Sequence, residues 1–289
     1  MVKIGVILNL SARKASKIDT DEIIAIIKRE LPDAKIYTIK ESFERTVQKA
    51  IRDGCKVLCA GGGDGTVSGI AARCVKKNLV LGVLPLGTMN NFSKDLGIPQ
   101  DVTKACKIIA RFKINKVDYA TVNNELFLNN SSVGAYARYV IEREGQQKAH
   151  GKISAYFTSL IATVDKIGLL DVRLQYNNNS QSVKTPIIFI SNNDYNINEK
   201  HFIRRKTLSS GELNVHILTL PKDNIMLNTL KHIITPNKTP IRYKSFHTKK
   251  LIIDTPNSKI SIAKDGEIIS TKLPLTYKIH SKKLSVIVP

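Results

Sequence analysis

The segment Gly61-Gly62-Gly63-Asp64-Gly65 restricts the fold more than any other part of this 289-residue chain. It follows an apolar run at 56–60 and precedes a stretch with helical spacing. Glycine has no Cβ atom, so a turn built from these residues lets backbone N–H groups approach an anion, with a helix N-terminus behind them. An acid in such a loop fits a divalent cation that bridges it to phosphate. A glycine-rich turn that binds no ligand is the alternative.

Two familiar phosphate-binding patterns do not fit this loop. A P-loop needs a lysine directly after its last glycine, and no lysine follows these glycines. The dinucleotide-binding pattern G-x-G-x-x-G, started at Gly61, reaches Thr66 where its third glycine should stand. The loop therefore indicates a phosphate site that is neither of these two.

Strand and helix patterns alternate through the first 117 residues. Side chains that can cap a first helical turn mark the helix starts, at Asp19 or Thr20, at Ser42 and at Asp101. Strands that alternate with helices of about 10 to 15 residues are typical of βαβ units and a parallel sheet. The apolar runs that we interpret as its strands are Lys3–Leu8, Ala34–Ile39, Lys56–Ala60 and Leu79–Leu84.

A second candidate loop follows the last of these strands and reads Pro85-Leu86-Gly87-Thr88-Met89-Asn90-Asn91-Phe92. In a parallel sheet, the loops at the carboxyl ends of neighbouring strands line one crevice, where ligands bind. Both glycine loops are therefore expected to face the same ligand. A simple strand exit with an asparagine helix cap is the alternative.

The pattern changes after about residue 118. An amphipathic helix is expected at Gly151–Ile167, because its apolar residues follow the spacing of one helix face. Consecutive strands with little helix between them then indicate an antiparallel domain. We place the domains at 1–117 and 118–279, with a last strand at about 280–289 that is able to return to the first. The expected strands are Asp171–Tyr176, Lys184–Ser191, Glu212–Leu220, Lys249–Asp254, Lys259–Ala263 and Lys283–Val288.

The net charge of +21 suits an anionic partner. The stretch from Lys231 to Lys250 is dense in lysine and arginine and holds no acid. An anionic membrane surface, a phosphorylated substrate and nucleic acid would each suit this charge, and plain solubility is the bland alternative. Nucleic acid is disfavoured, because aromatic residues make up only 6% of the chain, tryptophan is absent and no nucleic-acid-binding motif is present.

The location expected for the chain is the cytoplasm, with peripheral binding to a membrane. The sequence contains neither an apolar run of about 18 residues, as a membrane span requires, nor the pattern of a signal peptide at its N-terminus. The four cysteines lie in the first 110 residues without a C-x-x-C pair and are expected to be reduced core residues. The six histidines show no zinc-ligand spacing.

A third motif, Asp265-Gly266-Glu267, would by itself be read as a β-turn. Its order and spacing after Gly62-Gly63-Asp64-Gly65-Thr66 and Pro85-Leu86-Gly87-Thr88-x-Asn90 resemble the diacylglycerol kinase catalytic-domain family. That family includes bacterial lipid kinases and the sphingosine and ceramide kinases. Asn9, the segment Asn192-Asn193-x-Tyr195 and the pair Pro274-Leu275 are also similar to the family. The resemblance covers nearly the whole chain.

The resemblance implies an α/β, doubly wound nucleotide-binding domain followed by an antiparallel β-rich sandwich domain, with the active site between them. It implies that Asp64 places Mg²⁺, that Glu267 takes the proton from a substrate hydroxyl, and that Asp118 lies near the reaction centre. Phosphoryl transfer needs positioning, charge neutralisation and a base near the attacking oxygen. The residues expected to hold ATP are Asn9, Gly61, Gly62, Gly63, Asp64, Gly65, Thr66, Gly87, Thr88 and Asn90.

Three segments depart from the family pattern. Asn91 replaces the aspartate that usually ends G-T-x-N-D, and Leu10 follows Asn9 where proline and glycine are usual. Ser209–Asn214 replaces an acidic D-D-G-x-L-D segment that binds a structural metal in bacterial lipid kinases. The main hypothesis is an ATP-dependent lipid kinase that meets its lipid substrate at an anionic membrane surface. A non-catalytic nucleotide- or lipid-binding relative and a small-molecule kinase similar to NAD kinases remain alternatives.

Overall fold

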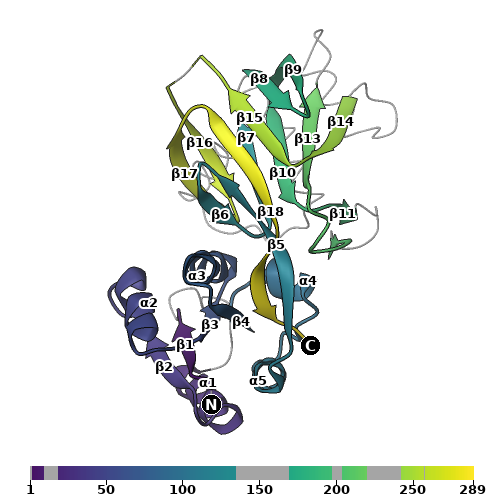
Figure 1. The fold of residues 1–289 in the computed structure, drawn as a ribbon. Coiled ribbons are helices and arrows are strands. Elements are labelled where there is room, and N and C mark those ends of the chain that lie inside the picture. The colour runs from purple at the N-terminus through teal and green to yellow at the C-terminus, as the bar shows by residue number, and fades with distance from the viewer. Residues whose placement is uncertain (1, 10–18, 135–168, 197–203, 220–241, 257) are drawn as a thin grey trace. The chain divides into compact units, whose positions relative to one another are not determined.

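A computed structural model describes residues 2–9, 19–134, 169–196, 204–219, 242–256 and 258–289 (Figure 1). The chain forms two compact units. The first holds the residues up to Tyr119 together with His280–Pro289, and the second is Ala120–Ile279. The boundary lies two residues after the one expected from the sequence, so Asp118 belongs to the N-terminal unit instead of the second domain. Two strands, β5 (Ile114–Val122) and β18 (Leu275–Ile287), run from one unit into the other.

The N-terminal unit is built on a parallel sheet. Its strands lie in the order β2-β1-β3-β4, and each neighbouring pair is parallel. β18 continues the sheet, because Val286 pairs with Leu81 of β4 in parallel. The four apolar runs that the sequence identified as strands are confirmed as β1 (Ile4–Leu8), β2 (Lys35–Thr38), β3 (Val57–Gly62) and β4 (Val80–Pro85).

Helices cover both faces of this sheet. Figure 1 shows α1 and α5 on one side, where they contact each other, and α2 and α3 on the other. The caps at Asp19, Ser42 and Asp101 are confirmed, since each side chain accepts a hydrogen bond from the first turn of its helix. The helices are α1 (Thr20–Glu30), α2 (Phe43–Arg52), α3 (Asp64–Lys77), α4 (Asn91–Asp95) and α5 (Val102–Arg111).

The four cysteines lie in the core of this unit as free thiols. Burial raises the pKa of Cys74 and of Cys106 to about 12. Burial also raises the pKa of Cys59, with neighbouring cysteines adding to the effect. These thiols therefore stay protonated at neutral pH and act as small apolar side chains.

The second unit contains two antiparallel layers that share one core. One layer has the strand order β14-β13-β10-β7-β16-β17, and the other contains β18-β15-β8-β9. Fully buried side chains from both layers, such as Ile190, Val215, Leu251 and Tyr277, form a single apolar cluster. The strands are β6 (Glu125–Phe127), β7 (Asn130–Gly134), β8 (Leu170–Tyr176), β9 (Asn179–Thr185), β10 (Ile187–Asn192), β11 (Tyr195–Asn196), β12 (Arg204–Arg205), β13 (Leu213–Thr219), β14 (Arg242–Thr248), β15 (Lys250–Asp254), β16 (Lys259–Lys264) and β17 (Glu267–Lys272).

The single strand expected at Lys184–Ser191 is wrong, because the chain changes layers at Pro186. β9 pairs with β8 in one layer, and β10 pairs with β7 and β13 in the other. Proline has no N–H to donate to a ladder. The break is held by Thr185, whose hydroxyl donates to Leu218 O (2.6 Å) and accepts from Ile187 N (3.1 Å). The helix expected at 151–167 lies outside the described residues.

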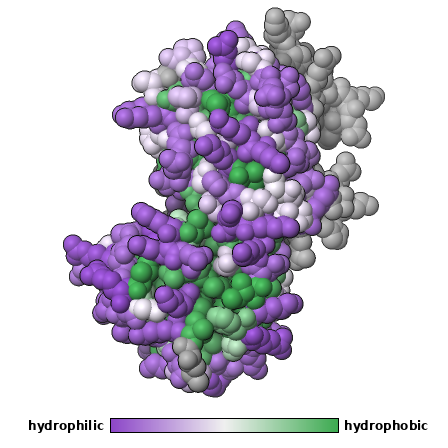
Figure 2. Space-filling view, viewed as in Figure 1, coloured by the Kyte–Doolittle hydropathy of each residue, from purple (hydrophilic) through white to green (hydrophobic). Residues whose placement is uncertain are grey.

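The surface visible in Figure 2 is largely hydrophilic, and apolar side chains gather on one part of the N-terminal unit. The exposed large apolar side chains of the described residues are Val2, Met89, Ile114 and Leu169. Among the described helices, none combines the length and the apolar character needed to cross a bilayer.

Candidate active site

The first glycine loop joins β3 to α3 and is closely packed against neighbouring side chains. A Cβ atom on Gly61 would lie 2.5 Å from Leu8 Cδ2, and one on Gly62 would lie 2.7 Å from the Thr66 side chain. Gly63 differs, because the nearest atom to its added Cβ would be Gly87 Cα at 3.6 Å, an ordinary contact. Packing therefore favours glycine at 61 and 62, whereas it leaves room for a Cβ atom at Gly63. Gly65 follows in the first turn of α3.

The N-terminus of α3 has the form of an anion site. Gly63 is its N-cap and provides no side chain to cap the first turn. The α3 backbone N–H groups at this end carry the positive end of the helix dipole. The arrangement can therefore bind a phosphate group over Gly63, where a side chain would be in the way.

Asn9 ties the end of β1 to this loop. Its backbone N–H donates to Gly61 O (2.8 Å), and its side-chain Nδ2 donates to Thr66 Oγ1 (2.9 Å). These bonds connect β1, β3 and the first turn of α3. The structure therefore brings Asn9 to the glycine loop, at the carboxyl end of its strand.

The carboxylate of Asp64 links the two glycine loops. Its Oδ2 accepts from Asn91 N and its Oδ1 accepts from Phe92 N, both at 3.1 Å. These are the first N–H groups of α4, so Asp64 caps a helix that begins 27 residues later in the chain. The sequence predicted a metal-positioning role for Asp64, and it gave no sign of this cap.

Asp64 takes the capping role because Asn90 is used elsewhere. Asn90 has φ of +51°, a left-handed conformation that asparagine tolerates. Its Oδ1 accepts from Gly87 N (3.0 Å), and its Nδ2 donates to Gly87 O (2.8 Å) and to Gln100 Oε1 (3.0 Å). Asn90 thus closes the second loop on itself, and Gln100 is a supporting residue that no sequence pattern indicated.

The second loop lies directly against the first. Leu86 N donates to Gly62 O (3.2 Å). A Cβ atom on Gly87 would lie only 2.4 Å from Gly63 Cα, so only glycine fits there. Thr88 and Met89 at the tip of the loop are exposed. The expected proximity of the two glycine loops is therefore found within the N-terminal unit.

Asp118 lies in β5 and is fully buried in the N-terminal unit. Its Oδ1 accepts from Lys282 N (2.7 Å) in β18, where Lys282 has φ of +51°. The neighbouring rings of Tyr119 and His280 stack with their centroids 4.5 Å apart. This contact joins β5 to the returning C-terminal strand. The sequence placed Asp118 in the other domain, because a strand that ends in a different unit gives no local signal.

Glu267 begins β17 in the second unit and is exposed. It pairs with Lys264 across a two-residue turn, in which Asp265 has φ of +48° and Gly266 has φ of +86°. These positive φ angles favour aspartate at the first position and glycine at the second. Asp265 has a structural role, since its carboxylate accepts hydrogen bonds from Leu128 N (2.8 Å) and Asn129 N (2.7 Å).

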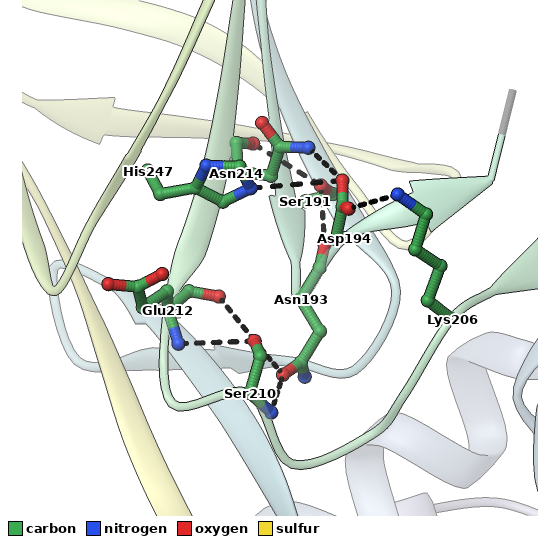
Figure 3. A network of polar contacts seen from close by, with 8 residues as sticks. All are labelled: Ser191, Asn193, Asp194, Lys206, Ser210, Glu212, Asn214 and His247. Atoms are coloured by element: carbon green, nitrogen blue, oxygen red, sulfur yellow. Dashed lines mark hydrogen bonds and ion pairs between the residues drawn. The ribbon is translucent and has the colours of Figure 1, made fainter.

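The Asn192-Asn193 turn follows β10 and is fully buried. Asn193 has φ of +69°, and its Oδ1 accepts from both the N–H (2.7 Å) and the hydroxyl (2.6 Å) of Ser210 (Figure 3). Ser191 Oγ donates to the carbonyl of Asn193 (2.8 Å). Ser210, in the segment that departs from the family pattern, therefore holds this turn through neutral hydrogen bonds.

Asp194 is the charged centre of the same network (Figure 3). Lys206 Nζ lies 2.9 Å from its Oδ2, Asn214 Nδ2 donates to its Oδ1, and His247 Nε2 lies 3.8 Å away. Burial raises the pKa of the Asp194 carboxyl, but the hydrogen bonds and positive charge of Lys206 outweigh burial and hold that pKa below its usual range. Lys206 thus supplies a positive charge at this carboxylate. No group of three or more metal-binding side chains occurs among the described residues.

His216 lies on the strand next to this network and is almost fully buried. Burial lowers its pKa to about 4, and the charge of Asp194 opposes the effect only in part. The imidazole is therefore neutral at physiological pH.

Comparison with known proteins agrees with the motif pattern. Residues 3–122 match the family model of the diacylglycerol kinase catalytic domain. The diacylglycerol kinase of Staphylococcus aureus (strain Newman) is 26% identical over 290 residues, which cover 91% of this chain and 88% of that protein.

Two solved structures from Bacillus anthracis strain Sterne share the fold. One is 22% identical to this chain, with a TM-score of 0.76. The match covers 99% of this chain and 97% of the solved chain. The other, a diacylglycerol kinase, is 20% identical with a TM-score of 0.68 and the same coverage. By sequence, residues 3–122 of this chain are therefore similar to the catalytic domain of the diacylglycerol kinase family.

Proposed function

We propose that this chain is an ATP-dependent lipid kinase, which transfers the γ-phosphate of ATP to a hydroxyl of diacylglycerol or a related lipid. The similarity to diacylglycerol kinases supports a lipid kinase in general. The observation that carries the proposal is the link from Asp64 to Asn91 and Phe92, which holds two glycine loops together at the N-terminus of α3. Backbone N–H groups in a glycine loop at a helix N-terminus form a site suited to phosphate groups.

ATP would bind with its phosphates over Gly63, the N-cap of α3, where the packing of the protein does not itself exclude a Cβ atom. The N–H groups that open α3 would neutralise part of the phosphate charge. Thr66 is held in place by Asn9, and Gly87 keeps the second loop close to the first. Thr88 is exposed at the tip of that loop, where its hydroxyl is able to meet the nucleotide.

Mg²⁺ would accompany ATP and would supply charge neutralisation for the transferred phosphate. A magnesium ion in kinases keeps several waters and needs only one or two protein carboxylates besides the substrate phosphates. Asp64 fits this limited demand, because it is a carboxylate at the start of α3 that already links this loop to the N–H groups of α4. It would therefore serve two purposes, holding the loops together and presenting a carboxylate beside the phosphate site.

Glu267 would act as the general base. The lipid hydroxyl oxygen attacks the γ-phosphorus, the bond from that phosphorus to the bridging oxygen breaks, and ADP leaves. The hydroxyl proton passes to the Glu267 carboxylate. Its position next to an anchored turn supports this role, since the Asp265 carboxylate accepts hydrogen bonds from Leu128 N and Asn129 N.

The lipid would be taken from an anionic membrane surface. In the second unit, exposed Lys250 stands directly opposite exposed Lys278 on neighbouring strands, next to exposed Lys249. Like charges in directly opposite positions are unfavourable unless an anion lies near them. Lipid head groups of negative charge would provide such anions.

The decisive experiment uses purified protein, ATP labelled at the γ-phosphate, Mg²⁺ and a total bacterial lipid extract. A labelled lipid, identified by mass spectrometry, is the expected product. Glu267→Gln protein is the control, because it should bind ATP and form little product. If no lipid is labelled while ATP binds, the chain is a non-catalytic member of the family. If a soluble metabolite is labelled instead, the acceptor class is wrong.

A further inference from the structure

The bend between β6 and β7 is held by charged groups on two sides. Leu128 and Asn129 form this bend, and both are buried. Buried backbone N–H and C=O groups need partners, because an unpaired one costs about 1–3 kcal/mol. The partners of this bend come from segments that lie more than 60 residues away in the sequence.

Asp265 binds the N–H side of the bend. Its Oδ2 accepts from Leu128 N (2.8 Å), and its Oδ1 accepts from Asn129 N (2.7 Å) and Asn130 N (3.2 Å). Asp265 N in turn donates to Asn130 O (2.9 Å). The turn that carries Glu267 is thus fastened to the bend through a charged acceptor, the stronger kind of hydrogen bond.

Arg205 binds the carbonyl side. Its Nη1 donates to Leu128 O and to Asn192 O (3.4 Å), and its Nη2 donates to Asn129 Oδ1 (3.2 Å). Asn192 reinforces the contact, as its Nδ2 donates to Leu128 O (2.8 Å) and its N–H donates to Asn129 O (3.0 Å). Arg205 is only 8% exposed, so its guanidinium replaces water at these oxygens.

We propose that Arg205 is a positioning residue for Glu267, acting through the Leu128–Asn129 bend and Asp265. The guanidinium at Leu128 O and the carboxylate at Asn129 N polarise the same peptide group from its two ends, so each strengthens the hydrogen bond of the other. Removing the guanidinium loosens the bend, and the Asp265 anchor then no longer fixes the turn. The inference rests on the proposed base role of Glu267. Neither the sequence nor the family resemblance singled out Arg205.

The test compares Arg205→Met and Arg205→Lys with Lys206→Met. Lysine at 205 keeps the charge but loses the planar group that reaches three acceptors. Lys206 is the matched control, because it is the neighbouring residue and pairs with Asp194 without touching the bend. The assay measures kcat and the KM for ATP with dioleoylglycerol in phosphatidylglycerol vesicles. Hydrogen–deuterium exchange of the segment 264–270 reports the turn without any need for activity.

Arg205→Met should lower kcat about 10- to 100-fold, since a small misplacement of a reacting group can cost that much, with the KM for ATP unchanged. Exchange at 264–270 should rise in the same variant. The kcat and the exchange of Arg205→Lys should lie between those of Arg205→Met and wild type. Lys206→Met should match wild type in both measurements. Asp265→Asn should reproduce the Arg205→Met result from the other side of the bend.

A double variant separates positioning from general stability. If Arg205 acts through Glu267, then Arg205→Met should cause no further loss of kcat in a Glu267→Gln background. A merely structural role predicts that Arg205→Met lowers kcat by the same factor in both backgrounds. That result would overturn the proposal, and so would unchanged hydrogen–deuterium exchange at 264–270. If wild type phosphorylates no lipid, the proposed function fails instead. Exchange alone then decides whether Arg205 holds the turn.

Discussion

A Cβ atom on Gly87 would lie 2.4 Å from the Cα atom of Gly63, whereas a Cβ atom on Gly63 would meet Gly87 Cα at 3.6 Å. The two glycines therefore have different roles, although they face each other. Gly87 is required by the fold, and Gly63 is free to accept a methyl group until a ligand needs the space. This difference makes Gly87 a packing glycine, whereas packing alone does not explain the glycine at 63.

Gly63→Ala should fold with a Tm near that of wild type and should lose at least about tenfold in ATP affinity, because the methyl group enters the phosphate position. Gly87→Ala should instead lose about 1–3 kcal/mol of stability through overpacking. Thermal unfolding and calorimetric titration with ATP measure both effects. Wild-type ATP affinity in Gly63→Ala would show that phosphate does not bind over this residue.

Asp64→Asn should reduce both stability and turnover. The amide has one acceptor oxygen, so one of the two N–H groups at Asn91 and Phe92 loses its partner, at a cost of about 1 kcal/mol. Asp101→Asn is the control, because Asp101 caps α5 through a single oxygen (2.8 Å to Lys104 N) that asparagine replaces well. Denaturant unfolding and phosphoryl transfer are measured together. Normal turnover in Asp64→Asn would exclude the metal-positioning role, and unchanged stability would exclude the capping role.

Glu267→Gln should lower kcat by about 10²–10⁴-fold, since the amide cannot take the hydroxyl proton. The KM for ATP should stay unchanged, because Glu267 is assigned no nucleotide contact. Glu125→Gln is the matched control, an exposed carboxylate in the same unit that pairs with Lys264. Steady-state kinetics with labelled ATP give the answer. A rise in KM at constant kcat would make Glu267 a binding residue instead.

Stability should fall as the pH is lowered from about 6.5 to about 4, through His216. The folded-state pKa is depressed, so in this window the unfolded chain binds a proton that the folded chain does not, and unfolding becomes easier. The full effect is up to about 3 kcal/mol. Urea unfolding at each pH should show a smaller pH slope in His216→Gln. His247→Gln, whose side chain is 47% exposed, should keep the wild-type slope.

Replacing Lys249 and Lys250 by Gln should weaken binding to phosphatidylglycerol vesicles by up to about 30-fold, at about 1 kcal/mol for each lysine. Added salt should release the wild-type protein, because such attraction is screened within about 8 Å at physiological ionic strength. Lys76 and Lys77, an exposed pair at the end of α3, provide the control substitution. Equal sedimentation with neutral phosphatidylcholine vesicles would exclude charge as the basis of membrane binding.

The elements of the N-terminal unit were predictable because each carries its own signal. Asp19, Ser42 and Asp101 lie next to the helices that they cap, and the cap depends on residues within three positions. The apolar runs of the parallel strands are continuous, since both faces of the sheet are covered. The glycine loop was also visible, because a turn without side chains stands out in a sequence.

The contacts that complete the site depend on distant segments and had no local signal. Asp64 reaches Asn91 and Phe92 only because β3 and β4 are neighbours, and Asp118 meets Lys282 only because β18 returns to the first unit. The second unit was predicted less well for the same reason. Its short strands are defined by their partners in the sheet, and Pro186 was read as part of one strand, when it divides two layers.

The return of β18 also sets an order of assembly. During synthesis, Ala120–Ile279 is made before His280–Pro289. The sheet that carries the glycine loop therefore lacks the Val286 partner of β4 until the segment 280–289 has emerged from the ribosome. Domains generally fold as units in the order in which they emerge. Here the unit that begins first is completed last, so a nascent or prematurely released chain does not possess a finished glycine-loop unit.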